Sequence, residues 1–289
     1  MPKTAILTDS ACDIPDELLA EYPNIRILNF TLTVGERVYT ERVDFTPQEY
    51  HRLLRETDQL PVTSLINSFE FLKNFEGYAA DGVEDLIVVT IAAVGSATYD
   101  AALLARKHFE GQQPSPAMRI HIVDSHTYSM AYGQPICEAA AMLLAGEPVQ
   151  KVIDFLEDAF ARSELVLSTY TLKYIRQSGR ISACAALAGD FLGLRPIVSM
   201  VDGGSVVKSK VRGDKQVLPA LVQYFIDNAV PGSPYQIGTT DMENAAVLAG
   251  LCEQAVGYPP IRWFYLGCCV TTNTGPEAIA ITYYGPKRR

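Results

Sequence analysis

Short apolar runs that alternate with helical stretches constrain the fold of this chain most strongly. Three runs of strand length lie in the first half, at residues 4–8 (TAILT), 86–92 (LIVVTIA) and 119–125 (RIHIVDS). Helical stretches are expected at 96–109, 128–145 and 149–162. Strands and helices in alternation imply right-handed crossovers and a mostly parallel sheet. We therefore predict an α/β class, with an N-terminal three-layer α/β domain over residues 1–163.

The second half has a different pattern, in which hairpins and helices follow one another. Strands are expected at 165–171 (LVLSTYT), in a hairpin over 196–213, and at the end in RWFYLGCCV (262–270) and AIAITYY (278–284). Helices are expected around 172–177, 181–193, 215–229 and 242–256. This mixture predicts a C-terminal α+β domain with a mixed sheet over residues 164–289. The whole chain is predicted to be a two-domain protein whose halves pack closely.

Local signals place three further features of the first half. Residues 26–43 are expected to form a hairpin that turns near Gly35. The segment Thr46-Pro47-Gln48-Glu49 is a capping box with Pro at the first helical position, so a helix is predicted to run to about Arg55. Asp13 is expected to cap the short helix that follows it, and Pro135 to kink or divide the helix around it.

Composition excludes several classes of function. The chain has 289 residues with 24 Lys and Arg against 33 Asp and Glu, and this net charge of −9 argues against nucleic-acid binding. Its six cysteines form no C-x-x-C pair and its four histidines lack ligand spacing, so we expect no metal and no cofactor. No apolar run approaches the roughly 18 residues of a membrane helix. The N-terminus shows no signal-peptide pattern, so a cytoplasmic protein is predicted.

Small hydroxyls and acids gather where the predicted strands end. They are Asp9 and Ser10, Thr63 and Ser64, Ser96 and Thr98, and Asp124 and Ser125. Ligands of open parallel sheets bind beyond the carboxyl ends of the strands. Ser96 and the Thr63-Ser64 pair would converge on one sheet edge and form a cup of neutral donors, which suits a carboxylate or a phosphate. Ser96 also has a simpler interpretation, as the N-cap of its helix.

Self-contained catalysis is poorly supported by the motifs. Asp124-Ser125-His126 has the residue types of a triad, but neighbours in sequence do not face one another as a triad requires. Nucleophile-elbow and nucleotide-binding glycine motifs are absent, so no catalytic residue is predicted. A small-molecule hydrolase or transferase that uses the hydroxyl cup as an oxyanion site is the competing class. A sensor of another apolar acid is a third.

Basic residues stand out in the second half of an otherwise acidic chain. They are Arg180, Arg195, Lys208, Lys210 and Arg212, of which the last three alternate along a predicted strand. A solvated strand face is one explanation. The other is a patch that receives phosphate groups carried by a partner.

Seven segments resemble the DegV family of bacterial fatty-acid-binding proteins, and in family order they span nearly the whole chain. They are ILTDSACDIP, VTSLINSFEF, GSATYDAA, IVDSHTYSMAYG, YIRQSGRIS, LRPIVSMVDGGSVVKSKVRG and NTGPEAIAI. The resemblance implies a two-domain α/β fold that buries the acyl chain of a long-chain fatty acid. It also implies that the bound acid is phosphorylated by a separate ATP-dependent fatty acid kinase for phospholipid synthesis.

The resemblance assigns roles to individual residues. It implies that hydroxyls of the Thr63-Ser64 and Ser96-to-Thr98 segments hold the carboxylate, whereas Asp9, Ser10, Asp124 and Ser125 brace the floor of the site. Arg180 and Arg212 are expected to face the kinase or the phosphoryl group. Two positions depart from the family pattern: Ala97 stands where the family has Gly, and Asn273 stands where it commonly has His. Asn273 can form only neutral hydrogen bonds with the carboxylate.

Overall fold

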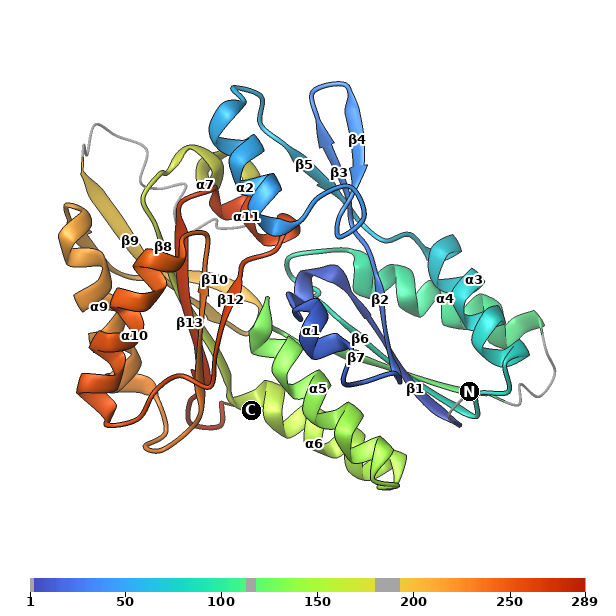
Figure 1. The fold of residues 1–289 in the computed structure, drawn as a ribbon. Helices are drawn as coiled ribbons and strands as arrows, with labels where there is room; N and C mark the ends of the chain where they lie inside the picture. The colour runs from blue at the N-terminus through green and yellow to red at the C-terminus, as the bar shows by residue number, and fades with distance from the viewer. Residues whose placement is uncertain (1–2, 113–117, 180–192, 289) are drawn as a thin grey trace.

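The computed structural model describes residues 3–112, 118–179 and 193–288. Its first half contains a parallel sheet and its second half a mixed sheet, which confirms the predicted fold class. Figure 1 shows these two sheets side by side with helices around them. Among the helices of the described residues, none has both the length and the apolar content to cross a membrane.

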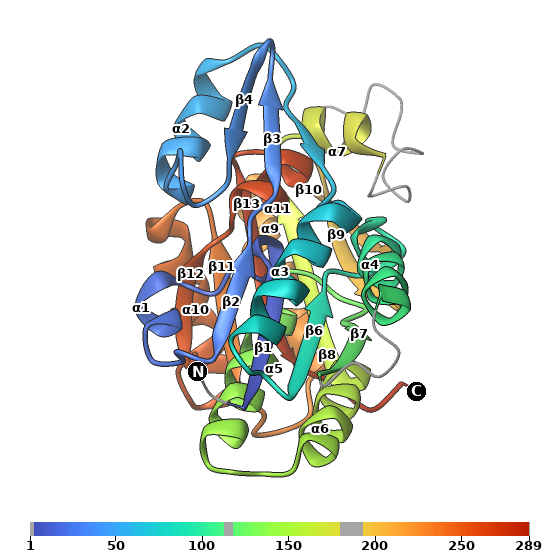
Figure 2. The ribbon, with the colours of Figure 1, turned by 90° about the vertical axis from the view of Figure 1, so that its right-hand side faces the viewer.

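The parallel sheet has four strands in the order β2-β1-β6-β7. They are β1 (Thr4–Asp9), β2 (Ile25–Leu28), β6 (Asp85–Thr90) and β7 (Arg119–Asp124). The helices of this half are α1 (Asp16–Leu19), α3 (Ser68–Ala80), α4 (Thr98–Gln112), α5 (Met130–Leu144) and α6 (Val149–Arg162). Figures 1 and 2 show α3 and α4 on one face of the sheet and α5 and α6 on the other. The three predicted layers are therefore present.

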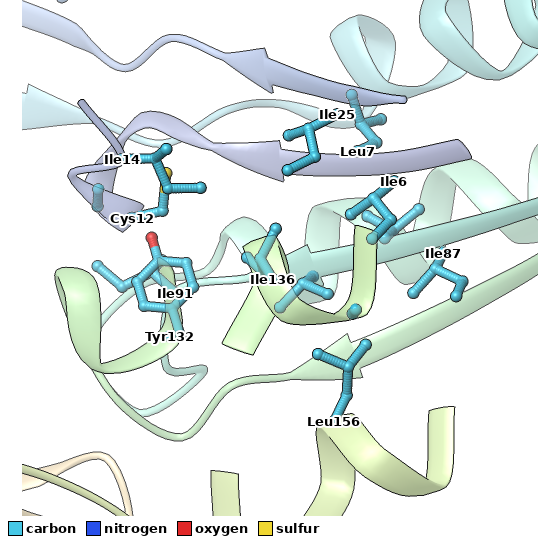
Figure 3. Close-up of a cluster of buried hydrophobic side chains, with 14 of the residues drawn as sticks. Ile6, Leu7, Cys12, Ile14, Ile25, Ile87, Ile91, Tyr132, Ile136 and Leu156 are labelled. Carbon is cyan, nitrogen blue, oxygen red and sulfur yellow. The ribbon is translucent and has the colours of Figure 1, made fainter. Parts of the chain in front are cut away.

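Apolar side chains of β1 and β6 form the centre of this half. Ile6, Leu7 and Ile87 are fully buried, and Figure 3 shows them with Ile136 of α5 and Leu156 of α6. Complete burial of such a side chain stabilises the fold by roughly 1.5–3 kcal/mol. Every residue of β6 is buried, as its continuous apolar run predicts for a strand covered on both faces.

The mixed sheet has six strands in the order β10-β9-β8-β13-β11-β12. They are β8 (Ser163–Thr169), β9 (Leu194–Val201), β10 (Gly204–Arg212), β11 (Tyr235–Thr239), β12 (Arg262–Tyr265) and β13 (Ala278–Tyr284). The helices α9 (Val217–Asn228) and α10 (Met242–Val256) accompany it, after a short 3₁₀ helix η2 (Asp214–Gln216). On β8, Leu165 and Leu167 join the core of the parallel half, whereas Val166 joins the core under α9 and α10. Alternation along one strand therefore links two cores.

A small third sheet connects the two halves. It pairs β3 (Thr31–Val34) with β4 (Arg37–Thr40) and β5 (Val62–Ser64), and α2 (Pro47–Glu56) lies beside it. The side chains of Tyr50 and Leu54 from α2 share a core with Tyr174 of α7 (Lys173–Ser178) and Cys268 of α11 (Cys268–Thr274). Tyr174 also donates its hydroxyl hydrogen to the Leu54 carbonyl, 2.6 Å away. A division between residues 163 and 164 remains our proposal for the domain boundary.

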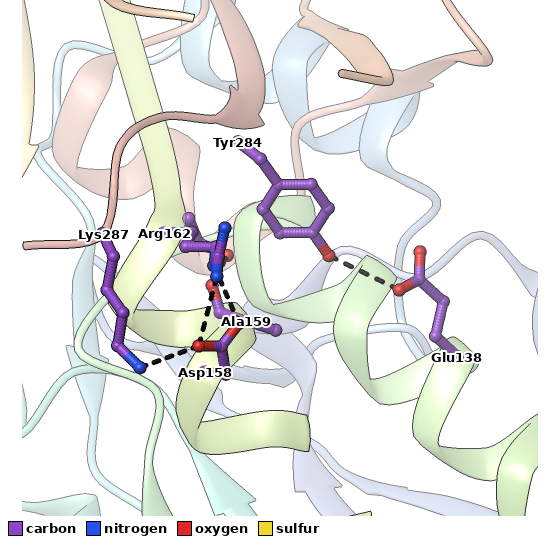
Figure 4. A network of polar contacts seen from close by, with 7 residues as sticks. Glu138, Asp158, Ala159, Arg162, Tyr284 and Lys287 are labelled. Carbon is purple, nitrogen blue, oxygen red and sulfur yellow. Dashed lines mark hydrogen bonds and ion pairs between the residues drawn. The ribbon is translucent and has the colours of Figure 1, made fainter. Parts of the chain in front are cut away.

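The end of the chain is fastened to the first half by polar contacts (Figure 4). The Lys287 ammonium lies 2.8 Å from the Asp158 carboxylate, which also accepts from Arg162 at 2.7 Å. The Tyr284 hydroxyl lies 3.5 Å from the Glu138 carboxylate. The last residue of β13 thus contacts α5, and Lys287 beyond the strand contacts α6.

Several local expectations are confirmed. The hairpin turns at Gly35, which has a φ of 62°, and Thr46 and Glu49 form the predicted capping box at the start of α2. The hairpin of β9 and β10 is present as well. The expected helix at 181–193 lies almost wholly outside the described residues.

Three local expectations are wrong, and of the two alternatives predicted for Pro135 the division of the helix is absent, while the kink stays a prediction. Asp13 does not cap α1: it ends the 3₁₀ helix η1 (Ser10–Cys12) with a φ of 54°, and Pro15 precedes α1. Residues 25–28 form a separate parallel strand rather than part of the hairpin. Helix α5 continues through Pro135 without division. RWFYLGCCV is not one strand: β12 ends at Tyr265, Gly267 is the N-cap residue of α11, and α11 begins at Cys268.

Candidate functional site

A cavity of about 790 Å³ lies where the parallel sheet, the mixed sheet and α11 meet. Most of its wall is apolar and includes Phe30, Ile91, Leu165, Leu167, Met200 and Leu266. Hydroxyl and amide side chains complete it, namely Thr63, Ser64, Asn67, Ser96, Tyr128, Asn273 and Thr274. Among the described lining residues, Asp100 is the one charged side chain. The cavity therefore combines a large apolar volume with uncharged donors.

Thr63 and Ser64 come from β5, the edge strand of the small sheet. Their partners in register are Leu32 and Thr31, which fixes β5 beside the hairpin. Thr63 is half-buried and Ser64 is exposed. Neither hydroxyl has a hydrogen-bond partner among the described residues, so both can serve a ligand.

Ser96 combines the two interpretations that its sequence allowed. It lines the cavity, and its Oγ also accepts the backbone N–H of Thr98 at 3.3 Å. Thr98 is fully buried and does not line the cavity, but its hydroxyl lies 2.9 Å from the Ser96 hydroxyl. When Thr98 donates in this pair, the Ser96 O–H is free to donate to an anion.

Acids at the ends of β1 and β7 shape the loop after β6. The Asp9 carboxylate accepts the Ile91 N–H at 2.7 Å, and the Asp124 carboxylate accepts the Ala93 N–H at 3.1 Å. Both Ile91 and Ala93 line the cavity. The strands on either side of β6 thus end on acids that hold the main chain of the cavity floor.

The two serines that follow these acids have different surroundings. Ser10 accepts the N–H of Phe30, which lines the cavity, at 2.9 Å. Ser125 instead bonds within its own turn, to the carbonyl and the N–H of Thr127. Ser10 therefore contacts the cavity wall directly, whereas Ser125 orders the turn behind it.

Burial changes the acid–base behaviour of the acids beneath the cavity. Removal from water raises the pKa of Asp9 to about 7, although hydrogen bonds from Tyr132 and from the backbone oppose this shift. Burial also raises the pKa of Asp13 well above its usual range and raises that of Glu41. The proximity of Glu41 adds to the shift of both aspartates. Glu41 carries no motif, so the sequence did not reveal its place in this cluster.

The residues from the second half occupy different places. Asn273 lines the cavity from α11, and its amide donates to the Cys269 carbonyl at 2.8 Å. Arg212 is exposed on β10 and lies outside the cavity. Arg180 lies outside the described residues. A bulge between Val207 and Ser209 interrupts the predicted alternation of the basic residues, because it removes Lys208 from the register.

Other chemistry finds less support in the described part of the chain. No group of three or more His, Cys, Asp or Glu side chains there could hold a metal ion.

The cavity is also lined by residues that no motif indicated, such as Phe30 and Val270. Their apolar character is shared with ordinary core residues, so only the fold reveals that they face a cavity.

Fold and cavity together define a two-part α/β protein with a largely apolar internal site. The chain belongs to the DegV family: the model for "Uncharacterised protein, DegV family" matches residues 3–285. A DegV domain-containing protein from Caldanaerobacter subterraneus subsp. tengcongensis is 26% identical over 286 residues, which are 98% of this chain and 99% of the relative.

Two solved structures share the fold. A stearic acid-binding protein from Eubacterium ventriosum has a TM-score of 0.87 and 23% identity, with 98% of each chain covered. A fatty-acid-binding DegV family protein from Thermus thermophilus has a TM-score of 0.85 and 22% identity, over 98% of this chain and 99% of that chain. The predicted family and fold are confirmed.

Proposed function

We propose that this chain is a cytoplasmic carrier that binds a long-chain fatty acid and presents its carboxylate to a separate ATP-dependent fatty acid kinase. The acyl tail would lie in the apolar part of the cavity. Thr63, Ser64 and Ser96 would hold the carboxylate, with Asn273 beside them. The observation that carries the proposal is one cavity whose wall is mostly apolar and whose lining includes the unpaired hydroxyls of Thr63 and Ser64.

The energetics favour a long apolar tail. Each buried methylene contributes about 0.8 kcal/mol, so a long acyl chain contributes on the order of 10 kcal/mol before the cost of ordering. A carboxylate taken out of water needs hydrogen bonds in return. The hydroxyls of Thr63 and Ser64 are unpaired among the described residues, and they supply such bonds.

The relatives support the same class of ligand. The structures from Eubacterium ventriosum and Thermus thermophilus are described as fatty-acid-binding, and a DegV family protein from Eubacterium eligens was loaded with heptadecanoic acid. By extension, the carboxylate end faces the kinase here, and Arg212 on the exposed face of β10 receives the phosphoryl group or the partner. A planar guanidinium suits a phosphate geometrically.

Organic extraction of the purified protein, followed by mass spectrometry, tests the ligand. A long-chain fatty acid in the extract supports the proposal. If the extract holds none, and calorimetry with oleate and stearate on delipidated protein detects no binding, the proposal fails.

Removal of the rim hydroxyls tests where the carboxylate lies. We expect Ser96→Ala to weaken oleate binding at least tenfold, and Ser96→Ala with Thr63→Ala to nearly abolish it, because a hydrogen bond to a charged group contributes roughly 1.5–3 kcal/mol. Thr33→Ala is the control, since Thr33 lies on the same small sheet but outside the cavity. Unchanged affinity in a folded double variant would place the carboxylate elsewhere.

A further inference from the structure

Glu41 closes a ring of hydrogen bonds beneath the cavity. Its carboxylate accepts the Ser10 hydroxyl at 2.5 Å, and Ser10 Oγ accepts the Phe30 N–H at 2.9 Å. The Glu41 N–H in turn donates to the Phe30 carbonyl at 3.0 Å. The second carboxylate oxygen of Glu41 accepts the Cys269 N–H at 2.9 Å. One buried side chain therefore holds two residues of the cavity wall, Phe30 and Cys269.

The bond to Cys269 matters because α11 is short and supplies a whole side of the cavity. Cys269, Val270, Asn273 and Thr274 all line the cavity from this seven-residue helix. Asn273 belongs to the polar rim, one helical turn beyond the residue that Glu41 holds. The position of α11 therefore affects both the volume available to the acyl tail and the polar side chains near the carboxylate.

The approach of α11 to the acids is close. A Cβ added to Gly267, the residue before α11, would collide with the Asp13 carboxylate and would come within 3.0 Å of Glu41 Oε1. Asp13 is anchored on the other side by the Ser129 hydroxyl, which donates to it. The helix thus starts directly against two buried acids.

Few positive charges balance these acids. Asp9, Asp13 and Glu41 are 0%, 5% and 2% exposed, and the nearby guanidinium of Arg42 is bound to Asp16 and to the Ile14 carbonyl. The titratable or charged groups that act on Glu41 or feel its charge are Asp9, Asp13, Arg42, Tyr50, Cys268 and Cys269. Carboxyls that share a buried site cannot all ionise near neutral pH, because like charges and desolvation oppose it.

We propose that Glu41 is a positioning residue that holds α11 in its place at the ligand cavity. We propose also that a proton retained among Asp9, Asp13 and Glu41 keeps α11 in this place at neutral pH. The inference rests on the proposed function for its ligand. Loss of the shared proton at alkaline pH adds a negative charge beside the start of α11. The resulting repulsion between Asp13 and Glu41 would loosen the helix and weaken fatty-acid binding.

Three variants test the proposal by oleate affinity at pH 6.5 and pH 9. Glu41→Ala should lower affinity at least tenfold at pH 6.5, because the Cys269 N–H loses its acceptor. Glu41→Gln keeps an acceptor and carries no charge, so its affinity should stay within threefold of the wild type at pH 6.5 and fall less at pH 9. Glu164→Gln is the matched control: Glu164 is also a buried carboxyl, but it pairs with Arg288 and lies outside the cavity.

A second measurement needs no ligand. Cys269 is 5% exposed and feels the charge of Glu41, so Glu41→Gln, which removes this charge but keeps an acceptor for the Cys269 N–H, is the reference. Iodoacetamide should modify Cys269 slowly in the wild type and in Glu41→Gln, but at least ten times faster in Glu41→Ala at the same pH. Peptide mass spectrometry reports the modification. If Glu41→Ala does not fold, Glu41→Asp replaces it, because the shorter carboxylate cannot reach both Ser10 and Cys269.

The outcomes separate the two proposals. Wild-type rates of Cys269 modification in folded Glu41→Ala would overturn the positioning role. A Glu41→Gln profile that falls with pH as steeply as the wild type would overturn the role of the shared proton. A wild-type protein that binds no fatty acid would refute the proposed function, while the modification experiment would still decide whether Glu41 holds α11.

Discussion

The dipeptide Thr-Asp stands at the end of β1 (Thr8-Asp9) and directly after β11 (Thr240-Asp241), with opposite results. After β1, Asp9 is fully buried and accepts hydrogen bonds from the backbone of Ala11 and Ile91 and from the Tyr132 hydroxyl. After β11, Asp241 is exposed and accepts the Glu243 N–H at 2.9 Å as the N-cap of α10. The difference lies in what covers each strand end: α5 brings Tyr132 over Asp9. An acid after a strand therefore becomes a brace or a cap according to its neighbours in space.

Replacement of Asp9 or Asp241 by Ala should give the largest difference in stability between the two strand ends. At pH 6 we expect Asp9→Ala to lower the free energy of unfolding by roughly 3 kcal/mol or more, because each buried donor left without a partner costs about 1–3 kcal/mol. Asp241→Ala removes one exposed cap and should cost about 1 kcal/mol. Urea unfolding followed by circular dichroism measures both. Equal losses in the two variants would show that Asp9 does not brace the floor.

The pH dependence of the free energy of unfolding should distinguish Asp9 from Asp241, by an effect of intermediate size. The pKa of Asp9 is raised to about 7 in the folded state, above its usual value of 3.8. Its contribution to stability is therefore present at low pH and is lost as pH rises from about 4 to about 7. Between pH 5 and pH 7.5, the wild type should lose on the order of 2 kcal/mol relative to Asp9→Asn.

Asp241→Asn is the matched control for this titration. Because it keeps the capping oxygen and lies at the surface, its stability should run parallel to that of the wild type over the same pH range. A constant difference between the wild type and Asp9→Asn would mean that Asp9 titrates normally.

The smallest effect on the fold is expected at a third strand end, that of β10. Arg212 is exposed there, and it has no ion pair among the described residues. Arg212→Ala should change the free energy of unfolding by less than about 0.5 kcal/mol and oleate affinity by less than about threefold. Phosphorylation of the bound acid by the cognate kinase should fall at least tenfold, about 1.4 kcal/mol of transition-state stabilisation. Unchanged phosphorylation would make Arg212 a solvated surface residue.

Periodicity predicted the two central strands of the parallel sheet well, because β1 and β6 are buried along nearly their whole length. The run 86–92 indicated β6, and the acids at 9 and 124 were expected at the floor that they hold through Ile91 and Ala93. Short apolar runs were less informative. Cys268 and Cys269 continue such a run after β12, yet they begin a helix whose start is fixed by Glu41, more than two hundred residues earlier. Contacts at that separation leave no local pattern.

The same limit explains the parts of the site that the sequence did not show. Thr63, Ser64 and Ser96 were recognisable as hydroxyls near strand ends, and the fold brings them to one cavity. Phe30 and Leu167 are apolar residues like any others in the core, and only their place around the same cavity makes them part of its wall. Whether a buried apolar side chain fills space or borders a cavity depends on volumes that periodicity does not encode.

The position of β13 has a consequence for how the protein assembles. This strand follows the other five strands of the mixed sheet in the chain, yet it lies in the middle of that sheet, between β8 and β11. Until β13 has left the ribosome, β8 and β11 each carry an unpaired edge, and such edges favour wrong association. The sheet can therefore close only after β13 is available, and a chain cut before residue 278 cannot form the six-stranded sheet at all.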